Sequence, residues 1–277
     1  MTELLADIQF SQVLSFVSSV QLDEPEKMLQ LALFHRNRFL ARSRDRSDAF
    51  WLSPKFKKWA ASGTPSLIMI QGAHSLRAET RNFILGMVEC IRTAGVPVLW
   101  ALCSGFDGRA RISAVDVLKY LVGQALRLRK SAPAGANRAI ASQFQTATTE
   151  AEWVGLLAMS LLGQKQIYIV VDVELINERL ETPLAGGSSN GGRGGLSLPA
   201  AFAELLRILA GFPDGPAVKV VLVSYGSAMF QAVDEAQREF VVPVRGALKR
   251  PVQRTAVTAA RRTIGRAAIP VRVGRVR

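Results

Sequence analysis

Short, continuously apolar runs alternate along the chain with longer segments in which apolar residues recur every three or four positions. The runs have the length and composition of strands buried on both faces, and the longer segments have the period of amphipathic helices. Strands separated by helices in this way form parallel sheets with helices on both faces. We therefore predict an α/β three-layer fold with about five strands, at residues 66–72, 96–103, 166–172, 217–224 and 240–244.

The same pattern divides the chain into three parts: a small helical N-terminal element at 1–49, an α/β domain at 50–244, and a tail at 245–277 that has lost all periodicity and is predicted to be disordered. Predicted helices cover residues 4–20, 26–40, 51–59, 76–93, 113–126, 150–162, 199–209 and 228–238.

Composition removes several classes of function. The chain has 277 residues, of which 49% are hydrophobic and 21% are charged, as in globular proteins. It contains no secretory pattern and no apolar run of about 18 residues, so we expect a cytoplasmic protein without a transmembrane segment. Two cysteines and two histidines are too few for a disulfide framework, a zinc site or a histidine-dependent triad.

The net charge of +13 belongs mostly to the tail, which holds ten basic residues and no acidic one, so residues 1–244 carry only +3. Such a tail could contact nucleic acid or another anionic surface in a salt-sensitive way, and could direct the protein to the nucleus. It lacks aromatic residues, so binding would be nonspecific. A truncated or misjoined gene product is the alternative origin of this segment.

Three further segments have a structural and a functional interpretation. The basic run at 36–46 is interpreted as a solvated helix face rather than an anion-binding patch. The aromatic cluster at 50–59 is interpreted as packing against the core rather than a ligand stack. The glycine-rich segment 186–195 is interpreted as a surface loop, because glycine loops bind phosphate only when held between a strand and a helix.

The stretch 66–92 passes from an apolar run through a glycine directly into a helix pattern, the arrangement on which phosphate-binding loops are built. Such a unit presents backbone N–H groups at a helix N-terminus. The template Gly-x4-Gly-Lys-Ser/Thr fails after its first glycine, because its last three positions hold Arg77, Ala78 and Glu79. A carboxylate in the first helical turn opposes a phosphate there. The vestigial nucleotide-binding candidates are Gly72, Ala73, His74, Ser75, Arg77 and Thr80.

The order of these pieces resembles the NACHT domains of fungal STAND-type P-loop NTPases. The resemblance covers 50–244 and includes the aromatic lead-in, the strands, and a Leu-x-x-Leu-x-x-Gln-Leu pattern, which the third helix of the α/β domain matches with one departure at Leu118, Leu121, Gln124 and Ala125. It implies a P-loop NTPase-like sheet that handles ATP and Mg²⁺.

The resemblance also assigns roles at the ends of two strands. Asp172 matches the Walker B aspartate that holds Mg²⁺, and Glu174 follows it as a second metal candidate. A strand-end carboxylate that caps a turn is the equally weighted alternative for Asp172. Asn177 stands where the family has its water-activating glutamate, with Glu178 one place later, and Tyr225 follows Ser224 where the family often has arginine.

These departures predict a degenerate NACHT-type domain that acts as a regulatory switch or an interaction scaffold with protein partners in signalling. Binding of ATP and Mg²⁺ is expected to be weak or lost, hydrolysis slow, and no residue is assigned a catalytic role. The alternative is a divergent but active ATPase of the same superfamily that uses Arg77, Asp172 and Glu174.

Overall fold

A computed structural model describes residues 22–40, 48–102, 112–128, 143–144, 146–176, 197–225 and 241–244. Their centre is a five-stranded sheet in which every pair of neighbouring strands is parallel, in the order β2-β3-β4-β1-β5. The fold is therefore α/β with an all-parallel sheet, as the apolar runs predicted. The strands are β1 (Ser66–Gly72), β2 (Val98–Ala101), β3 (Gln166–Asp172), β4 (Ala217–Ser224) and β5 (Val241–Val244).

The helices lie between these strands in the chain, with three before β1. They are α2 (Pro25–Leu40), α3 (Asp48–Leu52), α4 (Pro54–Ala61), α5 (Arg77–Thr93), α6 (Ala114–Leu128), α8 (Glu150–Leu161) and α9 (Leu198–Ala210), with short 3-10 turns η1 (His74–Leu76) and η2 (Val173–Leu175). None of these described helices is both long and apolar enough to cross a bilayer.

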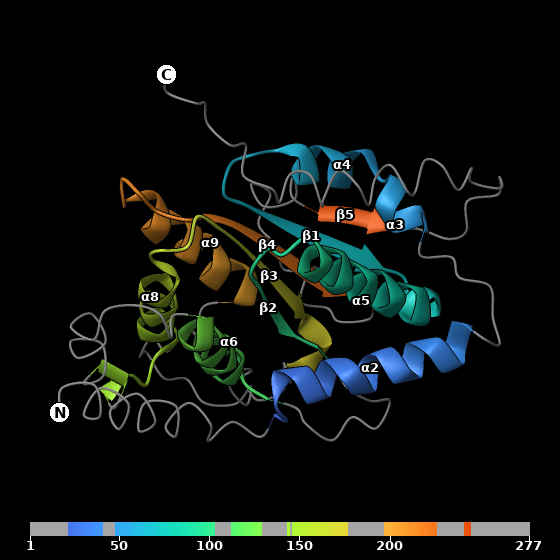
Figure 1. Cartoon of the computed structure of the whole chain (residues 1–277), viewed down its shortest axis with the longest axis horizontal. Coiled ribbons are helices and arrows are strands. Elements are labelled where there is room, and N and C mark those ends of the chain that lie inside the picture. Colours follow the sequence, from blue (N-terminus) through green and yellow to red (C-terminus); the bar gives the residue numbers. More distant parts are fainter. Residues whose placement is uncertain are drawn as a thin grey trace, which may run out of the picture.

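Helices cover both faces of the sheet, so the described part has three layers (Figure 1). Alternate residues of each strand point to opposite faces. In β3, Ile167, Ile169 and Val171 join a hydrophobic cluster with α6, α8 and α9. Tyr168 and Val170 join a second cluster with α2, α3, α4 and α5. Two separate cores, one on each face, therefore hold the sheet.

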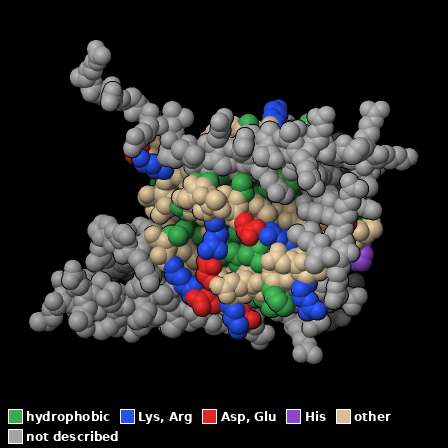
Figure 2. Space-filling model, turned by 45° about the vertical axis from the view of Figure 1, so that its right-hand side comes forward, with side chains coloured by type: hydrophobic (Ala, Val, Ile, Leu, Met, Phe, Trp, Pro, Cys, Tyr) green, Lys and Arg blue, Asp and Glu red, His purple; other side chains and the backbone are tan. Residues whose placement is uncertain are grey.

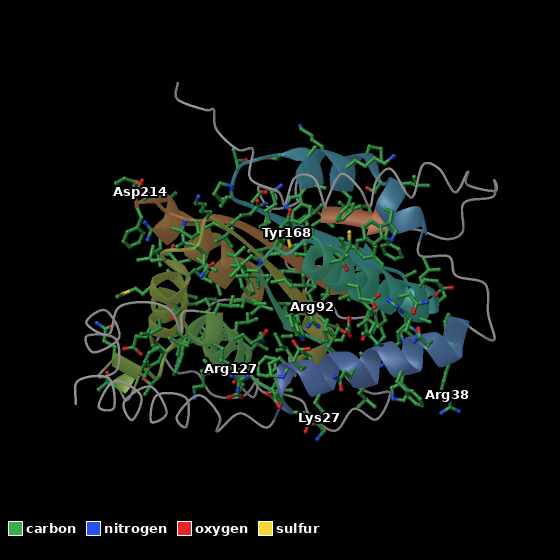
Figure 3. All side chains as sticks on the ribbon, viewed as in Figure 1. Lys27, Arg38, Arg92, Arg127, Tyr168 and Asp214 are labelled. Atoms are coloured by element: carbon green, nitrogen blue, oxygen red, sulfur yellow. The ribbon has the colours of Figure 1, made fainter. Side chains whose placement is uncertain are left out.

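The aromatic lead-in packs against the second core, as interpreted from the sequence. Phe56 stacks on Trp59 at 5.6 Å between ring centroids, and Trp59 meets the edge of Tyr168 at 6.2 Å. Tyr168 is fully buried in the middle of the molecule (Figure 3), on the face of the sheet that α4 and α5 cover. The buried ammonium of Lys219 donates to the backbone oxygen of Trp59 and lies 4.9 Å from its ring, which ties α4 to β4.

One helix predicted at 51–59 is wrong in detail, because the segment forms two helices, α3 and α4. Proline has no backbone N–H, so Pro54 cannot make the hydrogen bond that would continue α3. It stands at the start of α4 instead, where no such bond is needed. Ser53 caps that start by accepting from the backbone N–H of Phe56 at 3.5 Å.

Helix α2 packs directly on the α/β domain along α5. Its N-terminal end is held where Trp100 Nε1 donates to the backbone oxygen of Pro25 at 3.1 Å. Two ion pairs follow along the interface, Arg92 with Glu26 at 3.1 Å and Arg36 with Glu89 at 2.6 Å. Buried Leu29 belongs to the core formed with α5. In Figure 3, α2 runs alongside α5, with Arg92 between them.

Several predictions lie outside the described residues: the helices at 4–20 and 228–238, the glycine-rich segment 186–195, Asn177, Glu178 and the basic tail at 245–277. Over the described surface, basic and acidic side chains are interspersed, as Figure 2 shows on one face. That mixture agrees with the small net charge of the chain before the tail.

Candidate functional site

The candidate residues meet at the carboxyl edge of the sheet. Gly72 ends β1, Asp172 ends β3 and Ser224 ends β4, and β4 lies between the other two strands. The chain leaves β1 toward the face that α5 covers, whereas after β3 it continues to α9 on the opposite face. In open parallel sheets, ligands bind outside the carboxyl ends of strands where the chain departs in opposite directions. The geometry thus defines a candidate site at the ends of β1, β3 and β4.

The loop after Gly72 does not form a phosphate cradle of the αR–αL kind. Ala73 is extended, and residues 74–76 make the 3-10 turn η1, closed by the backbone N–H of Leu76 donating to the oxygen of Ala73 at 2.7 Å. Among the described residues, positive φ angles occur only at Gly95 and Gly163. His74 and Ser75 are exposed, whereas the side chain of Leu76 is buried beneath the turn.

Thr80 occupies the space above Gly72. A Cβ atom added to Gly72 would lie 2.3 Å from Thr80 Oγ1, so the glycine is required by this close approach. The buried Thr80 hydroxyl donates to the backbone oxygen of Leu76 at 2.8 Å. Side-chain atoms of Thr80 therefore fill the space beside Gly72.

Arg77 and Glu79 lie in the first turn of α5, as predicted. The Arg77 guanidinium lies 5.3 Å from the ring centroid of Tyr225, which follows β4. This cation–π contact holds the arginine against a neighbouring strand end. Glu79 is half-buried and brings a carboxylate to the helix N-terminus.

The acidic pair after β3 is bonded to the end of β4. Tyr225 Oη donates to Asp172 Oδ2 at 3.1 Å. Glu174 Oε1 accepts from Ser224 Oγ at 2.8 Å and from the backbone N–H of Tyr225 at 2.9 Å. Asp172 Oδ1 accepts from the backbone N–H of Glu174 at 3.1 Å, so Asp172 also caps the turn η2. The capping role that the sequence left open is confirmed, and the metal role stays a prediction.

Burial raises the pKa of Asp172 to about 6 from an ordinary value of 3.8. The charge of Arg81 and the hydrogen bonds from Glu174 N–H and Tyr225 Oη oppose this shift of the pKa, and the charge of Glu174 adds to it. The carboxyl of Asp172 is therefore unusually easy to protonate for an aspartate.

A divalent cation would find few ligands here. Among the described residues, no group of three or more His, Cys, Asp or Glu side chains could hold a metal ion. Mg²⁺ bound with nucleotide needs only one or two carboxylates, which Asp172 and Glu174 could supply. However, both oxygens of Asp172 and one of Glu174 already accept hydrogen bonds from the protein, which a metal ion would have to compete with.

Sequence reasoning missed two features of this region. The bond between Tyr225 and Asp172 joins residues 53 positions apart, and only the strand order brings them together. A pocket of about 80 Å³ between α2 and α5, reaching Asp172, was also missed because the docking of α2 cannot be deduced from its own periodicity.

Comparisons with protein-family models, curated proteins and solved structures find no match to this chain.

Proposed function

We propose that this protein is a degenerate P-loop domain of the NACHT type, which acts as a regulatory switch or interaction scaffold and binds nucleotide weakly or not at all. The proposal rests on the resemblance at 50–244 together with the parallel sheet, whose carboxyl edge carries both Gly72 and Asp172. Protein partners in signalling are part of the same proposal.

The observation that carries the proposal is the bonding of the acidic pair to the end of β4. A metal-binding aspartate and its neighbour would need free oxygens facing a Mg²⁺–phosphate group. Here their oxygens accept from Tyr225 Oη, Ser224 Oγ and two backbone N–H groups. A nucleotide would have to exchange these bonds for new ones, so its net binding energy would be small.

The loop after Gly72 supports the same conclusion. It has no lysine to contact the β- and γ-phosphates, and Glu79 adds a negative charge to the first turn of α5. The Thr80 hydroxyl lies over Gly72 and already donates to the backbone oxygen of Leu76.

A rebuilt loop tests this proposal. We expect no saturable binding of a fluorescent ATP analogue to the wild type at micromolar concentrations. The triple variant Arg77→Gly, Ala78→Lys, Glu79→Ser restores the template, and it should bind the analogue at least about tenfold more tightly than the wild type. Arg77→Gly alone is the control and should gain nothing. Tight wild-type binding, or no gain in the rebuilt loop, would overturn the proposal.

An active but divergent ATPase is the second candidate, favoured by the position of Asp172 and Glu174 at the same sheet edge as the loop. It requires Mg²⁺-dependent hydrolysis by the wild type that Asp172→Asn abolishes. If the wild type shows no Mg²⁺-dependent ATP hydrolysis, this second candidate function is excluded.

A further inference from the structure

A pocket of about 80 Å³ lies between α2 and α5 and reaches the ends of β2 and β3. Its wall is mostly apolar, with Ala32 and Phe39 from α2, Leu85 from α5 and Leu102 after β2. Four side chains with N–H donors also line it: His35, Arg36, Arg81 and Asn82. Of these, Arg36 and Asn82 carry buried donor atoms. Apolar walls with a few placed polar groups are typical of sites for small organic ligands.

Asn82 is 6% exposed, and its Nδ2 atom has no hydrogen-bond partner within the part of the chain that the structure describes. A buried amide donor without a partner costs stability, and native proteins rarely keep one unless a ligand, ion or water satisfies it. Asparagine is also a poor residue for the interior of a helix. Neither packing nor helix formation accounts for Asn82, whereas a bound acceptor would.

Arg36 provides the second donor of this kind. Its Nη1 atom pairs with Glu89 at 2.6 Å, but its buried Nε atom also lacks a partner among the described residues. Both donors thus belong to side chains of one pocket, on the two helices that form its sides.

The side chains that line the pocket carry more positive than negative groups, and Glu89, which pairs with Arg36, lies outside this lining. Two arginines, Arg36 and Arg81, line it together with one carboxylate, that of Asp172. Tyr225 Oη and the backbone N–H of Glu174 already donate to this carboxylate. Hydrogen bonds from arginine and amide donors to an ionised carboxylate are stronger than those to a neutral carbonyl.

We propose that this pocket binds a short-chain aliphatic carboxylate, with its carboxylate at Asn82 and Arg36 and its apolar body against Phe39, Leu85 and Leu102. The volume, about half that of an engineered cavity that holds benzene, limits the enclosed apolar body of the ligand to about three carbon atoms. This proposal goes beyond the proposed function and does not depend on it, because the binding needs neither nucleotide nor Mg²⁺.

Isobutyrate is the probe, added to the full chain without nucleotide and followed by ¹⁵N–¹H NMR. The side-chain NH₂ signals of Asn82, assigned by their loss in Asn82→Leu, should shift with a saturable Kd of about 1 mM or tighter. Isobutyramide, which keeps the shape without the charge, should bind about tenfold more weakly.

Asn82→Leu separates a ligand-binding role from a structural one. It should raise the melting temperature of the ligand-free protein, because it removes an unpartnered buried donor, and it should weaken isobutyrate binding by about tenfold or more. If the leucine cannot be accommodated and the variant does not fold, Asn82→Ala removes the same donor with a smaller side chain and should give the same loss of binding.

Gln124 is the matched control for stability, because both polar atoms of its buried amide have a partner: Oε1 accepts from Trp100 N–H at 3.0 Å and Nε2 donates to Trp100 O at 2.8 Å. Gln124→Leu should lower the melting temperature, opposite to Asn82→Leu. Ser160→Ala, in α8 and outside the pocket, is the control for binding and should leave the isobutyrate Kd unchanged.

Three results would overturn the proposal: no saturable shift of the Asn82 signals, unchanged isobutyrate affinity in Asn82→Leu, or binding of ATP instead of isobutyrate that Asn82→Leu abolishes. The first two leave the degenerate P-loop assignment standing, since neither measurement involves nucleotide. ATP binding by the wild type would contradict both proposals. The rebuilt-loop experiment detects it separately, because it measures binding of an ATP analogue to the wild type without isobutyrate.

Discussion

The acidic pair at the carboxyl edge of the sheet and the α2–α5 pocket share one residue, Asp172, but they differ in hydrogen bonding. The acidic pair has partners within the protein, whereas two donors of the pocket have none among the described residues. At the edge, oxygens of Asp172 and Glu174 accept hydrogen bonds from the protein's own β4 end. In the pocket, the donors on Arg36 Nε and Asn82 Nδ2 have no partner among the described residues.

This difference shows which region would gain from a ligand. A polar group that is already bonded must give up its partner when a ligand arrives, so the exchange yields little free energy. A buried donor without a partner has already lost its water when the protein folds, so a new hydrogen bond to a ligand contributes more free energy. We therefore expect the edge to bind Mg²⁺ and nucleotide poorly, and each new hydrogen bond to an acceptor in the pocket to contribute more binding free energy than one at the edge.

The strongest disruption of the edge is Glu174→Ala. It removes the acceptor of the buried Ser224 hydroxyl and of the Tyr225 backbone N–H, and each unsatisfied donor costs about 1–3 kcal/mol. The free energy of unfolding should fall by about 2–6 kcal/mol in urea denaturation. Glu79→Ala, at the start of α5, should change it by less than about 1 kcal/mol. Equal losses in both variants would contradict the bonding described for Glu174.

The pH dependence of stability tests the burial of Asp172. Because its folded pKa of about 6 lies above its ordinary value of 3.8, the folded protein binds the proton more tightly. The resulting stabilisation is fully present below about pH 4 and is lost as the pH rises through about 6, a change of about 3 kcal/mol at most.

The measurement is the difference in unfolding free energy between the wild type and Asp172→Asn at several pH values from 4 to 7. That difference should move in favour of the variant as the pH rises, because asparagine does not titrate. A constant difference across this range would mean that the pKa of Asp172 is ordinary.

The contact of Thr80 with Gly72 gives a smaller effect with a specific rescue. Gly72→Ala should lower the free energy of unfolding by about 1–3 kcal/mol, because its Cβ would collide with Thr80 Oγ1. Thr80→Ala removes that oxygen, so the double variant should lose less than the sum of the two single losses. Strict additivity would show that Thr80 does not hold this position in solution.

Much of the fold could be predicted from the sequence because buried parallel strands are apolar on both faces and need no long-range information to be recognised. The runs at 66–72, 166–172 and 217–224 became β1, β3 and β4 with these bounds. Their parallel pairing then placed Gly72 and Asp172 at one edge, as expected for strands of one direction.

The local chemistry of the site was less predictable. The template departures at Arg77, Ala78 and Glu79 could be read directly, but the 3-10 turn at 74–76 depends on packing of Leu76. The hydrogen bond of Tyr225 to Asp172 and the docking of α2 on α5 depend on tertiary arrangement, which no local pattern encodes. The basic run at 36–46 illustrates this, because Arg36 lines a pocket although its neighbours suggested a solvated face.

The most direct test of the central claim is a thermal-shift measurement with ATP, with and without Mg²⁺, on the wild type and on Asp172→Ala. Because the acidic pair is bonded to β4 and the loop lacks its lysine, we predict that ATP leaves the melting temperature of both proteins unchanged and that Mg²⁺ makes no difference. A Mg²⁺-dependent rise of several degrees in the wild type that Asp172→Ala abolishes would contradict the account.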